Sequence, residues 1–353
     1  MDQAKKSQTR QVPSALVLTR AEIAGLMTLA DYRASAEEAF KAVALGHAMV
    51  APPMHIAADQ GGFHAKGALL RREDGAAFVA VKINGNFPGN PLQNGLPTIQ
   101  GAIILSDARD GSLLAIMDSI EVTLRRTAAA SALAARYLAR RDAATLTLFG
   151  CGEQARAQLA ALNDEFSLRR VYVWDVDASA AAAFADEMST QLGLEIRSAA
   201  DRAAAAKTSD LIVTCTTSRT PFLHETEVRP GTFIAAVGAD SPDKSELAPR
   251  LMARAKVVVD LLEQCLSMGD LHHAVAAGVM TANDVYATLP ELAASKKPGR
   301  VDDNEITVFD STGTAIQDVA AAVRIYERAR TSGRGLACDF GRSPPSPAGR
   351  SKC

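Results

Sequence analysis

Residues 145–175 read TLTLFGCGEQARAQLAALNDEFSLRRVYVWD and indicate the architecture of the chain. The apolar run 146–149 is followed by a glycine turn, an alanine-rich helical pattern and a second apolar run, 171–174, that ends at Asp175. This succession predicts a strand, a turn, a helix and a second strand with a terminal acid. Such a unit is typical of dinucleotide-binding domains.

The turn has the pattern G-x-G-x-x-A. Gly150 permits the tight turn, Gly152 lets the backbone approach a pyrophosphate, and Ala155 replaces the third glycine, where helix and strand pack closely. The first N–H groups of the helix, around Gln154, would then bind the phosphates. An ordinary tight turn between strand and helix is the alternative, but the flanking strands and the spaced acid favour dinucleotide binding.

Asp175 also indicates which dinucleotide is bound. A carboxylate at the end of the second strand accepts hydrogen bonds from ribose hydroxyls and repels a 2′-phosphate. Asp177 adds negative charge, and residues 178–183 contain no Arg or Lys. The sequence therefore predicts NAD(H) in preference to NADP(H).

Beyond Asp175, apolar runs alternate with helical patterns. Strands are predicted at Leu194–Arg197, Leu211–Cys215, Phe233–Val237, Val257–Asp260 and Thr307–Phe309. This alternation predicts an α/β fold with a doubly wound parallel sheet of the Rossmann type. Thr216 directly follows one of these strands and is a further candidate for cofactor contact.

The pattern before residue 140 is different. Strands are predicted at Ala15–Leu18, Met54–Ala58, Gly62–Leu70, Ala77–Ile83, Gly101–Ser106 and Leu113–Asp118. Strands this close in sequence favour antiparallel pairing. Helices are predicted from Thr19 to Met27, Tyr32 to Leu45, Ile120 to Ala139 and Ala315 to Arg330, with a Gly-, Pro- and Asn-rich loop at 84–97.

These patterns divide the chain into two domains and two tails. We expect a flexible arm at 1–13, a Rossmann domain at 141–314 and a disordered tail at 339–353. Residues 14–140, together with 315–338, would form an α+β domain that supplies the substrate-binding side chains.

The composition excludes several classes of function. The chain has 353 residues, is 48% hydrophobic and carries a net charge of −2, with no basic run for nucleic acid or an anionic membrane. No apolar stretch is long enough to span a membrane, and the polar first residues do not resemble a signal peptide. The five cysteines and six histidines show no metal-ligand spacing. We therefore expect a cytoplasmic protein without a bound metal.

Four charged residues are candidates for substrate binding or catalysis. Lys82 in AVKING and Lys66 in FHAKGALL lie in strands, so each side chain points either to solvent or into a pocket. Arg126 is placed at the opening of an alanine-rich helix, where a cation requires an anion or an outward orientation. Asp240 follows the strand FIAAVG on the ligand side of a parallel sheet, with an Asx turn or a helix cap as the alternative.

Five separated motifs make the chain resemble the ornithine cyclodeaminase/μ-crystallin family, from about Leu16 to Arg330. They are VKINGNFPGN, RTAAASALAARYLA, GCGEQA, VGADSPDKSEL and TVFDSTGTAIQDVAAA. The resemblance implies a homodimer with a substrate/dimerisation domain beside the Rossmann domain. It also implies cyclodeamination of ornithine or lysine, alanine dehydrogenation or reduction of cyclic imino acids, although some members are binding proteins with little catalysis.

The resemblance extends to individual residues. Lys82 resembles the lysine that contacts the substrate carboxylate and the reacting centre, and Arg126 resembles the arginine that holds the carboxylate. Asp240 resembles the acid that positions a water or the substrate amine. Thr127, next to Arg126, resembles a residue that reaches the cofactor phosphates.

Two departures from the family pattern concern the substrate. Many relatives have Pro-Pro-Arg where this chain has Pro52-Pro53-Met54, and Lys66 could supply the missing charge. His64 occupies the place where cyclodeaminases carry a glutamate for the distal ammonium of ornithine. Lys66 lies on the same face of the strand and would repel that ammonium.

The sequence therefore favours an NAD(H)-dependent oxidoreductase of small α-imino or α-amino acids. Suitable substrates are a cyclic ketimine such as pyrroline-2-carboxylate, or a 2-oxo acid with ammonia. The alternatives are an ornithine cyclodeaminase that recycles NAD and a non-catalytic ligand-binding protein of the same fold.

Overall fold

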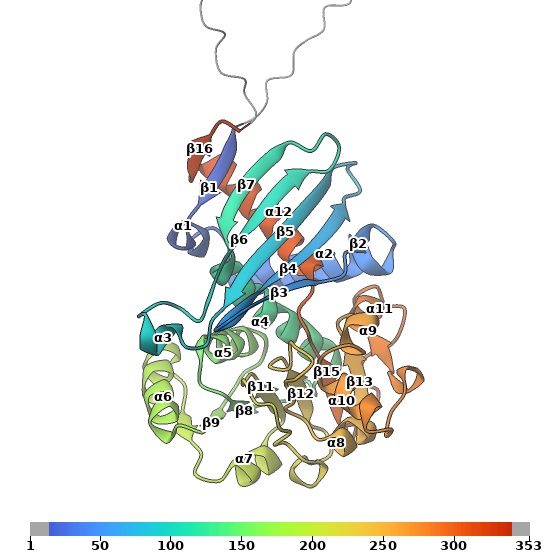
Figure 1. Cartoon of the computed structure of the whole chain (residues 1–353). Coiled ribbons are helices and arrows are strands. Elements are labelled where there is room, and N and C mark those ends of the chain that lie inside the picture. The colour runs from blue at the N-terminus through green and yellow to red at the C-terminus, as the bar shows by residue number, and fades with distance from the viewer. Residues whose placement is uncertain (1–13, 341–353) are drawn as a thin grey trace, which may run out of the picture.

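The computed structural model describes residues 14–340, which form two eight-stranded sheets and the helices around them (Figure 1). The predicted arm at 1–13 lies outside the described residues, as does the predicted tail at 339–353 apart from Asp339 and Phe340. Among the described helices, none is long and apolar enough to cross a membrane.

The sheet that contains the glycine turn is parallel throughout, which confirms the predicted doubly wound fold. Its strands lie in the order β10-β9-β8-β11-β12-β15-β13-β14. Their bounds are β8 Thr145–Phe149, β9 Arg170–Trp174, β10 Ile196–Ser198, β11 Leu211–Thr214, β12 Phe233–Ala236, β13 Lys256–Val259, β14 Ala287–Thr288 and β15 Thr307–Asp310. The order reverses between β8 and β11, and the crevice at their carboxyl ends is where sheets of this type bind ligands.

Helices of different lengths connect these strands. They are α5 Glu153–Glu165, α6 Ala178–Leu192, α7 Arg202–Thr208, α8 Pro249–Arg254, α9 Leu262–Cys265, α10 Asp270–Ala276 and α11 Leu289–Ala293, with 3₁₀ turns at Glu225–Glu227 and Ala282–Asp284.

The other sheet is mixed and has the order β16-β1-β7-β6-β5-β4-β2, with β3 also paired to β4. The bounds are β1 Ala15–Leu18, β2 Ala48–Val50, β3 Met54–Ala58, β4 Gly61–Arg71, β5 Ala77–Asn86, β6 Ile99–Asp107, β7 Leu113–Asp118 and β16 Leu336–Cys338. Strands β3 to β7 pair antiparallel as predicted, whereas β1 runs parallel to β7.

Helices cover only one face of this mixed sheet (Figure 1). The final long helix, α12 (Ala315–Ser332), packs on β4, β5 and β6, and α2 (Leu29–Ala44) packs against α12. Helix α4 (Ser119–Leu138) contacts strands of both sheets, and its buried alanines permit the close approach. Through α4 and α12, the inner face of the mixed sheet meets the parallel sheet.

The opposite face of the mixed sheet is apolar and exposed. Residues two apart on a strand point to the same face of the sheet. The register between adjacent strands then places their outward side chains side by side. The large apolar side chains that it exposes are Met49, Met54, Ile56, Phe63, Val81, Ile83 and Ile104. We call these residues the outer face.

Several predicted bounds are wrong, for local reasons. The first helix, α1, spans only Arg20–Ala24, because Gly25 caps its end; Thr19 caps its start as predicted. Helix α2 begins at Leu29 because Thr28 forms a capping box with Asp31. The predicted loop at 84–97 contains the end of β5 and a short helix, α3 (Asn90–Gln93).

The glycine turn yields a test of the fold. Gly150 has φ +94°, and a Cβ there would lie 2.8 Å from the Cys215 carbonyl oxygen. We expect Gly150→Ala to lower the free energy of unfolding by about 2 kcal/mol or more, through backbone strain and overlap. Gly152→Ala is the matched control, since nothing lies within 4 Å of a Cβ at that position. Equal stability of the two variants in urea titrations would contradict this account of the turn.

Candidate active site

A buried carboxylate joins two of the predicted cations. Asp318, in the first turn of α12, binds Lys82 Nζ through Oδ2 at 2.8 Å and Arg126 Nε through Oδ1 at 3.0 Å. Lys82 comes from β5 and is 5% exposed, and Arg126 comes from α4 and is 6% exposed. Three segments far apart in sequence therefore meet at one carboxylate.

The structure corrects the predicted position of Arg126. Helix α4 begins at Ser119, where Asp118 caps it, so Arg126 lies well inside the helix rather than at its N-terminus. Its guanidinium therefore avoids the positive end of the helix dipole. It pairs with Asp318 and donates to Gln317 Oε1 at 3.0 Å.

Burial sets the charge state of this cluster. Desolvation lowers the pKa of Lys82 to about 8, although Asp318 partly offsets this effect. Desolvation also acts to raise the pKa of Asp318, but Lys82 and Arg126 outweigh it and hold that pKa below its usual value. Asp318 is thus ionised at neutral pH, and Lys82 can exchange a proton close to neutral pH.

Lys66 is the cross-strand neighbour of Lys82, and both point to the inner face of the sheet. Its ammonium donates to the carbonyl oxygens of Thr312 and Gly313 at 3.1 and 2.9 Å. Asp260 holds this loop by accepting from Gly313 N at 2.8 Å and from Thr312 Oγ1 at 3.2 Å. The loop that follows β15 therefore brings the parallel sheet to the cations of the mixed sheet.

Asp240 faces the same cations from the parallel sheet. It lies in the loop after β12, and its side chain is 51% exposed and pairs with Lys244 at 2.6 Å. Desolvation acts to raise its pKa, but Lys244, Lys66 and His64 lower it overall. The structure thus brings Asp240, Lys66 and His64 within electrostatic reach of one another.

The glycine turn provides an open cradle at the start of α5. Gly152 is the N-cap residue, no side chain caps the helix, and the space beside its Cα is empty. Gln154 Nε2 is buried there without a hydrogen-bond partner among the described residues. Such a helix start fits a bound pyrophosphate. Asp175 accepts hydrogen bonds from the backbone N–H groups of Cys151 at 2.9 Å and Asp177 at 3.1 Å, so it also fastens the turn.

Glu246, which sequence reasoning did not single out, fixes the neighbouring strand ends. It accepts hydrogen bonds from the backbone N–H of Thr216 and the hydroxyl of Thr214, and from Gly238 N beyond β12. Burial raises the pKa of Glu246 to about 7. Thr216 is thus held at the edge of the crevice.

Thr127 lies half-buried on α4, directly after Arg126.

Asp318 was also missed. It belongs to the quoted motif TVFDSTGTAIQDVAAA, but the sequence does not show which side chain faces Lys82 and Arg126. The available signal was an acid in the apolar first half of that helix, because a buried carboxylate requires a cation.

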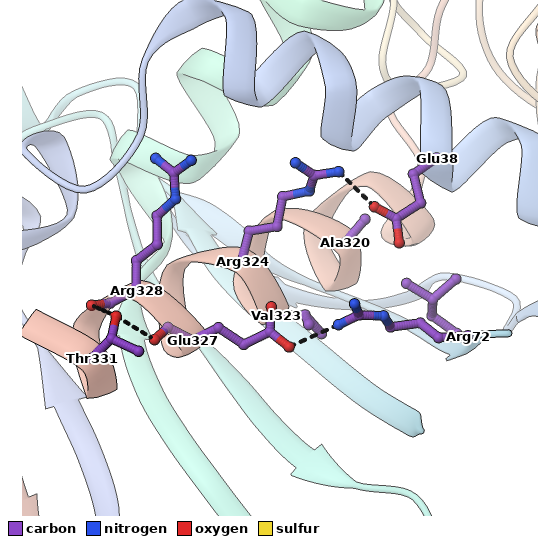
Figure 2. Close-up of a pocket in the computed structure, with 9 residues that line it drawn as sticks. Glu38, Arg72, Ala320, Val323, Arg324, Glu327, Arg328 and Thr331 are labelled. Carbon is purple, nitrogen blue, oxygen red and sulfur yellow. Dashed lines mark hydrogen bonds and ion pairs between the residues drawn. The ribbon is translucent and has the colours of Figure 1, made fainter. Parts of the chain in front are cut away.

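A hollow lies between α2, β4 and α12, and none of the candidate site residues line it (Figure 2). Figure 2 shows charged side chains that neutralise one another across it. The arginine pairs are Arg72–Glu327, Arg324–Glu38 and Arg328–Asp31. This hollow is therefore a weaker candidate for an anionic substrate than the cluster around Lys82.

The shared carboxylate can be tested by stability. Asp318→Asn leaves two buried cations without their counter-charge, so we expect a loss of about 3–5 kcal/mol in the free energy of unfolding. Glu37→Gln is the control, because it removes a carboxylate from the half-exposed i,i+4 pair with Lys41 and should cost less than about 1 kcal/mol. Similar losses in both variants, measured by denaturant titration, would show that Asp318 does not hold the cluster.

Three solved structures have the same fold over nearly the whole chain. An archaeal alanine dehydrogenase dimer with bound NAD is 38% identical, with a TM-score of 0.87, over 93% of this chain and 99% of that one. The Δ1-pyrroline-2-carboxylate reductase of Thermococcus litoralis, in complex with NADH and L-proline, is 34% identical, with a TM-score of 0.87, over 91% and 99%. The iminosuccinate reductase of Paracoccus denitrificans, in complex with NAD⁺, is 31% identical, with a TM-score of 0.85, over 93% and 100%.

These names describe oxidoreductases of amino and imino acids, which agrees with the predicted class, but the three substrates differ. Residues 14–333 match the ornithine cyclodeaminase/mu-crystallin family. With this match and the three structural relatives, the chain belongs to the ornithine cyclodeaminase/mu-crystallin family.

Proposed function

We propose that this protein is an NAD(H)-dependent oxidoreductase of small α-imino or α-amino acids. The observation that carries the proposal is the convergence of Lys82, Arg126 and Lys66 opposite the ligand-binding edge of the parallel sheet, where Asp240 lies. Lys82 and Arg126 share the single carboxylate of Asp318, so the pair keeps positive charge for a substrate carboxylate. The mixed sheet would form the substrate domain, and the parallel sheet the cofactor domain.

The cation cluster would bind and orient the substrate carboxylate. Lys82 and Arg126 are charge-assisted donors held in place by Asp318, and Lys66 lies beside Lys82 on the next strand. Because Asp318 fixes both donors before substrate binds, little ordering is required on binding. The α-carbon next to that carboxylate would then face the crevice of the parallel sheet.

The cofactor would occupy the cradle on the parallel sheet. The residues proposed to hold NAD(H) are Gly150, Gly152, Gln154, Ala155, Thr127, Thr216 and Asp175. NAD(H) held there would supply the hydride for the carbon of the C=N bond. Asp175 supports preference for NAD(H), since its carboxylate would repel a 2′-phosphate.

Asp240 and Lys82 would protonate the imine nitrogen and stabilise the positive charge that results. A protonated imine accepts hydride more readily, and the Asp240 carboxylate would stabilise that cation or relay its proton to nitrogen. Lys82 has a pKa of about 8 and can also donate a proton near neutral pH.

Ornithine cyclodeamination is the second candidate, because it begins with the same hydride transfer. The position of Lys66 disfavours it: the ammonium lies on the inner face beside Lys82, where it would repel a distal ammonium. A non-catalytic binding protein is the remaining alternative.

The four described cysteines are free thiols, which supports placement in the reducing cytoplasm.

We further propose a homodimer formed through the outer face. Exposed apolar side chains from β2 to β6 are contiguous there, and large patches of this kind usually mark protein contacts. A second copy of the chain is the proposed partner, supported by the dimeric state of the archaeal alanine dehydrogenase.

The enzyme proposal is tested by NADH absorbance with pyrroline-2-carboxylate, and in parallel with pyruvate plus ammonia. We expect loss of NADH in at least one assay, at least about tenfold faster than with NADPH. Lys82→Met should lower kcat/KM on the order of 100-fold, the scale expected for one preorganised charged donor. Lys41→Met, on the surface of α2, is the control and should change kcat/KM less than about threefold.

Other outcomes of these assays decide between the alternatives. Ammonia release from L-ornithine with catalytic NAD⁺, and no net NADH loss in the first two assays, would establish the cyclodeaminase instead. No turnover in any of them would favour the binding protein.

The dimer is tested by sedimentation. We expect the wild-type chain of 37.1 kDa to sediment as a dimer. Ile104→Glu should give the monomer, because it places a charge in the centre of an apolar contact. Val301→Glu is the control, since Val301 is exposed but lies outside the outer face. A monomeric wild type, or a dimeric Ile104→Glu, would refute this interface.

A further inference from the structure

Glu246 is a buried carboxyl group that the proposed reaction does not use. Its Oε1 accepts hydrogen bonds from Thr216 N and Thr216 Oγ1 at 2.6 and 2.7 Å. Its Oε2 accepts from Thr214 Oγ1 at 2.7 Å and from Gly238 N at 2.9 Å. The residue is fully buried, and within residues 14–340 no lysine or arginine forms an ion pair with it. Hydrogen-bond donors alone, two on each oxygen, therefore stabilise its charge.

These hydrogen bonds join two strands that carry different parts of the proposed site. Thr214 and Thr216 lie at the end of β11, and Thr216 is assigned to the cofactor. Gly238 follows β12, and its carbonyl oxygen accepts from Asp240 N at 3.0 Å. A Cβ on Gly238 would overlap the carboxyl group of Glu246, so the close approach requires glycine. One carboxylate thus sets the spacing between the cofactor strand and the loop of Asp240.

The main chain of Glu246 is fixed by a further element. Asp270, at the start of α10, is fully buried and accepts through Oδ1 from Glu246 N at 2.8 Å and from Leu247 N at 3.0 Å. Because both the backbone and the carboxyl group of Glu246 are held, the side chain is not free to turn away from the strand ends. A change at the carboxyl group is therefore passed directly to β11 and β12.

Protonation is such a change. The ionised carboxylate only accepts hydrogen bonds and matches the donors that surround it. A proton on either oxygen would face an N–H group or a hydroxyl that already donates to Glu246. At least one of the bonds would then have to break or reverse its direction, so the neutral acid holds the strand ends less firmly.

The surroundings of Glu246 bring this protonation close to neutral pH. Desolvation, and then the nearby Asp270, raise the pKa of Glu246 to about 7, although the bonds from Thr214 and Thr216 act to lower it. The titratable side chains that interact with Glu246 are Asp270 on α10 and the Cys215 thiol after β11. Neither is a cation, so neither offsets the cost of burying the carboxylate.

We propose that Glu246 is a positioning residue for hydride transfer, and that its ionised carboxylate holds Thr216 and the Asp240 loop at the spacing the reaction needs. This inference rests on the proposed function and adds regulation of the same site by pH. Glu246 acts through Thr216 and Asp240 and is assigned no contact with substrate or cofactor. Protonation loosens the strand ends and slows turnover.

The dependence of kcat on pH tests this role. The pKa of Glu246 lies above its ordinary value, so the carboxylate is ionised above about pH 7 and protonated below it. Glu246→Gln resembles the protonated acid, because its amide nitrogen can only donate. With saturating NADH and imino acid, we expect the ratio of wild-type to variant kcat to be on the order of ten at about pH 8 and to fall toward one at about pH 6.

This ratio isolates Glu246 from the other titrating groups. Protonation of the substrate, of His64 and of Lys82 affects both enzymes alike and cancels. Glu227→Gln is the matched control, because that carboxylate binds Arg202 at 3.0 Å and the backbone of His224 instead of the ends of β11 and β12. Its ratio to wild type should not change with pH. A ratio for Glu246→Gln that is also independent of pH would overturn the inference.

A second variant tests the same role without removing the carboxylate. Thr214→Val keeps the shape of the side chain and deletes one donor to Glu246. The ionised form then loses one hydrogen bond, so the acidic limb of the kcat profile should move to higher pH by about one unit. An unmoved limb would show that the titrating group is not Glu246.

Hydrogen–deuterium exchange gives a readout without turnover. After correction for the intrinsic effect of pH, peptides covering 214–216 and 237–240 should exchange faster at about pH 6 than at about pH 8 in the wild type, and fast at both in Glu246→Gln. Turnover with a constant kcat ratio would overturn this inference and leave the proposed function standing. No NADH oxidation with any substrate would overturn both, and exchange would still show whether protonation loosens the strand ends.

Discussion

The site depends on one ion cluster, in which Asp318 neutralises both Lys82 and Arg126. The three residues come from α12, β5 and α4. The carboxylate of Asp318 therefore links helix α12 to a strand of the mixed sheet and to helix α4. Each charge is buried, and each alone would be costly in a medium of low dielectric constant. The cluster is therefore stable only when all three elements are in place, which couples the fold to the geometry of the cations.

Further buried carboxylates fix the loops of the parallel sheet around this cluster. Asp260 holds the loop after β15 that binds Lys66, and Glu246 holds the ends of β11 and β12. Gly238 permits the approach of Glu246, because a Cβ there would lie 2.4 Å from Glu246 Oε1. Asp270 accepts a hydrogen bond from the backbone N–H of Glu246 at 2.8 Å, and burial raises the pKa of Asp270 above its usual value. Rigid loops at this edge are what a preorganised site requires.

The sequence predicted the parts of the fold that local patterns determine. The alternating apolar runs after residue 140 predicted the parallel sheet, and the glycine turn predicted the unpaired start of α5. Edge strands such as β2 and β16 were missed, because three residues give no usable periodicity and their pairing depends on distant partners. Arg126 was placed at the opening of its helix although that helix was predicted to begin at Ile120; it begins at Ser119, so Arg126 lies well inside it.

The candidate cations were identified from sequence, but their anion was not. Nothing in the sequence near Lys82 or Arg126 identifies Asp318, since contacts across about 190 to 240 residues are created by the packing of α12 on the sheet. The alternation along β4 placed His64 and Lys66 on one face, but His55 and Asn84 joined them only through the register of β3, β4 and β5. Pairing across strands supplied the information that the linear pattern lacked.

The central claim is that Lys82 and Arg126 bind the substrate carboxylate so that its α-carbon faces the nicotinamide. The most direct measurement is the destination of deuterium from NADH labelled at both C4 positions, followed by mass spectrometry and NMR of the amino acid product. The account predicts one deuterium at the α-carbon of each product molecule, with NAD⁺ formed in equal amount. Product without deuterium at that carbon, or formed without net NADH oxidation, would contradict it.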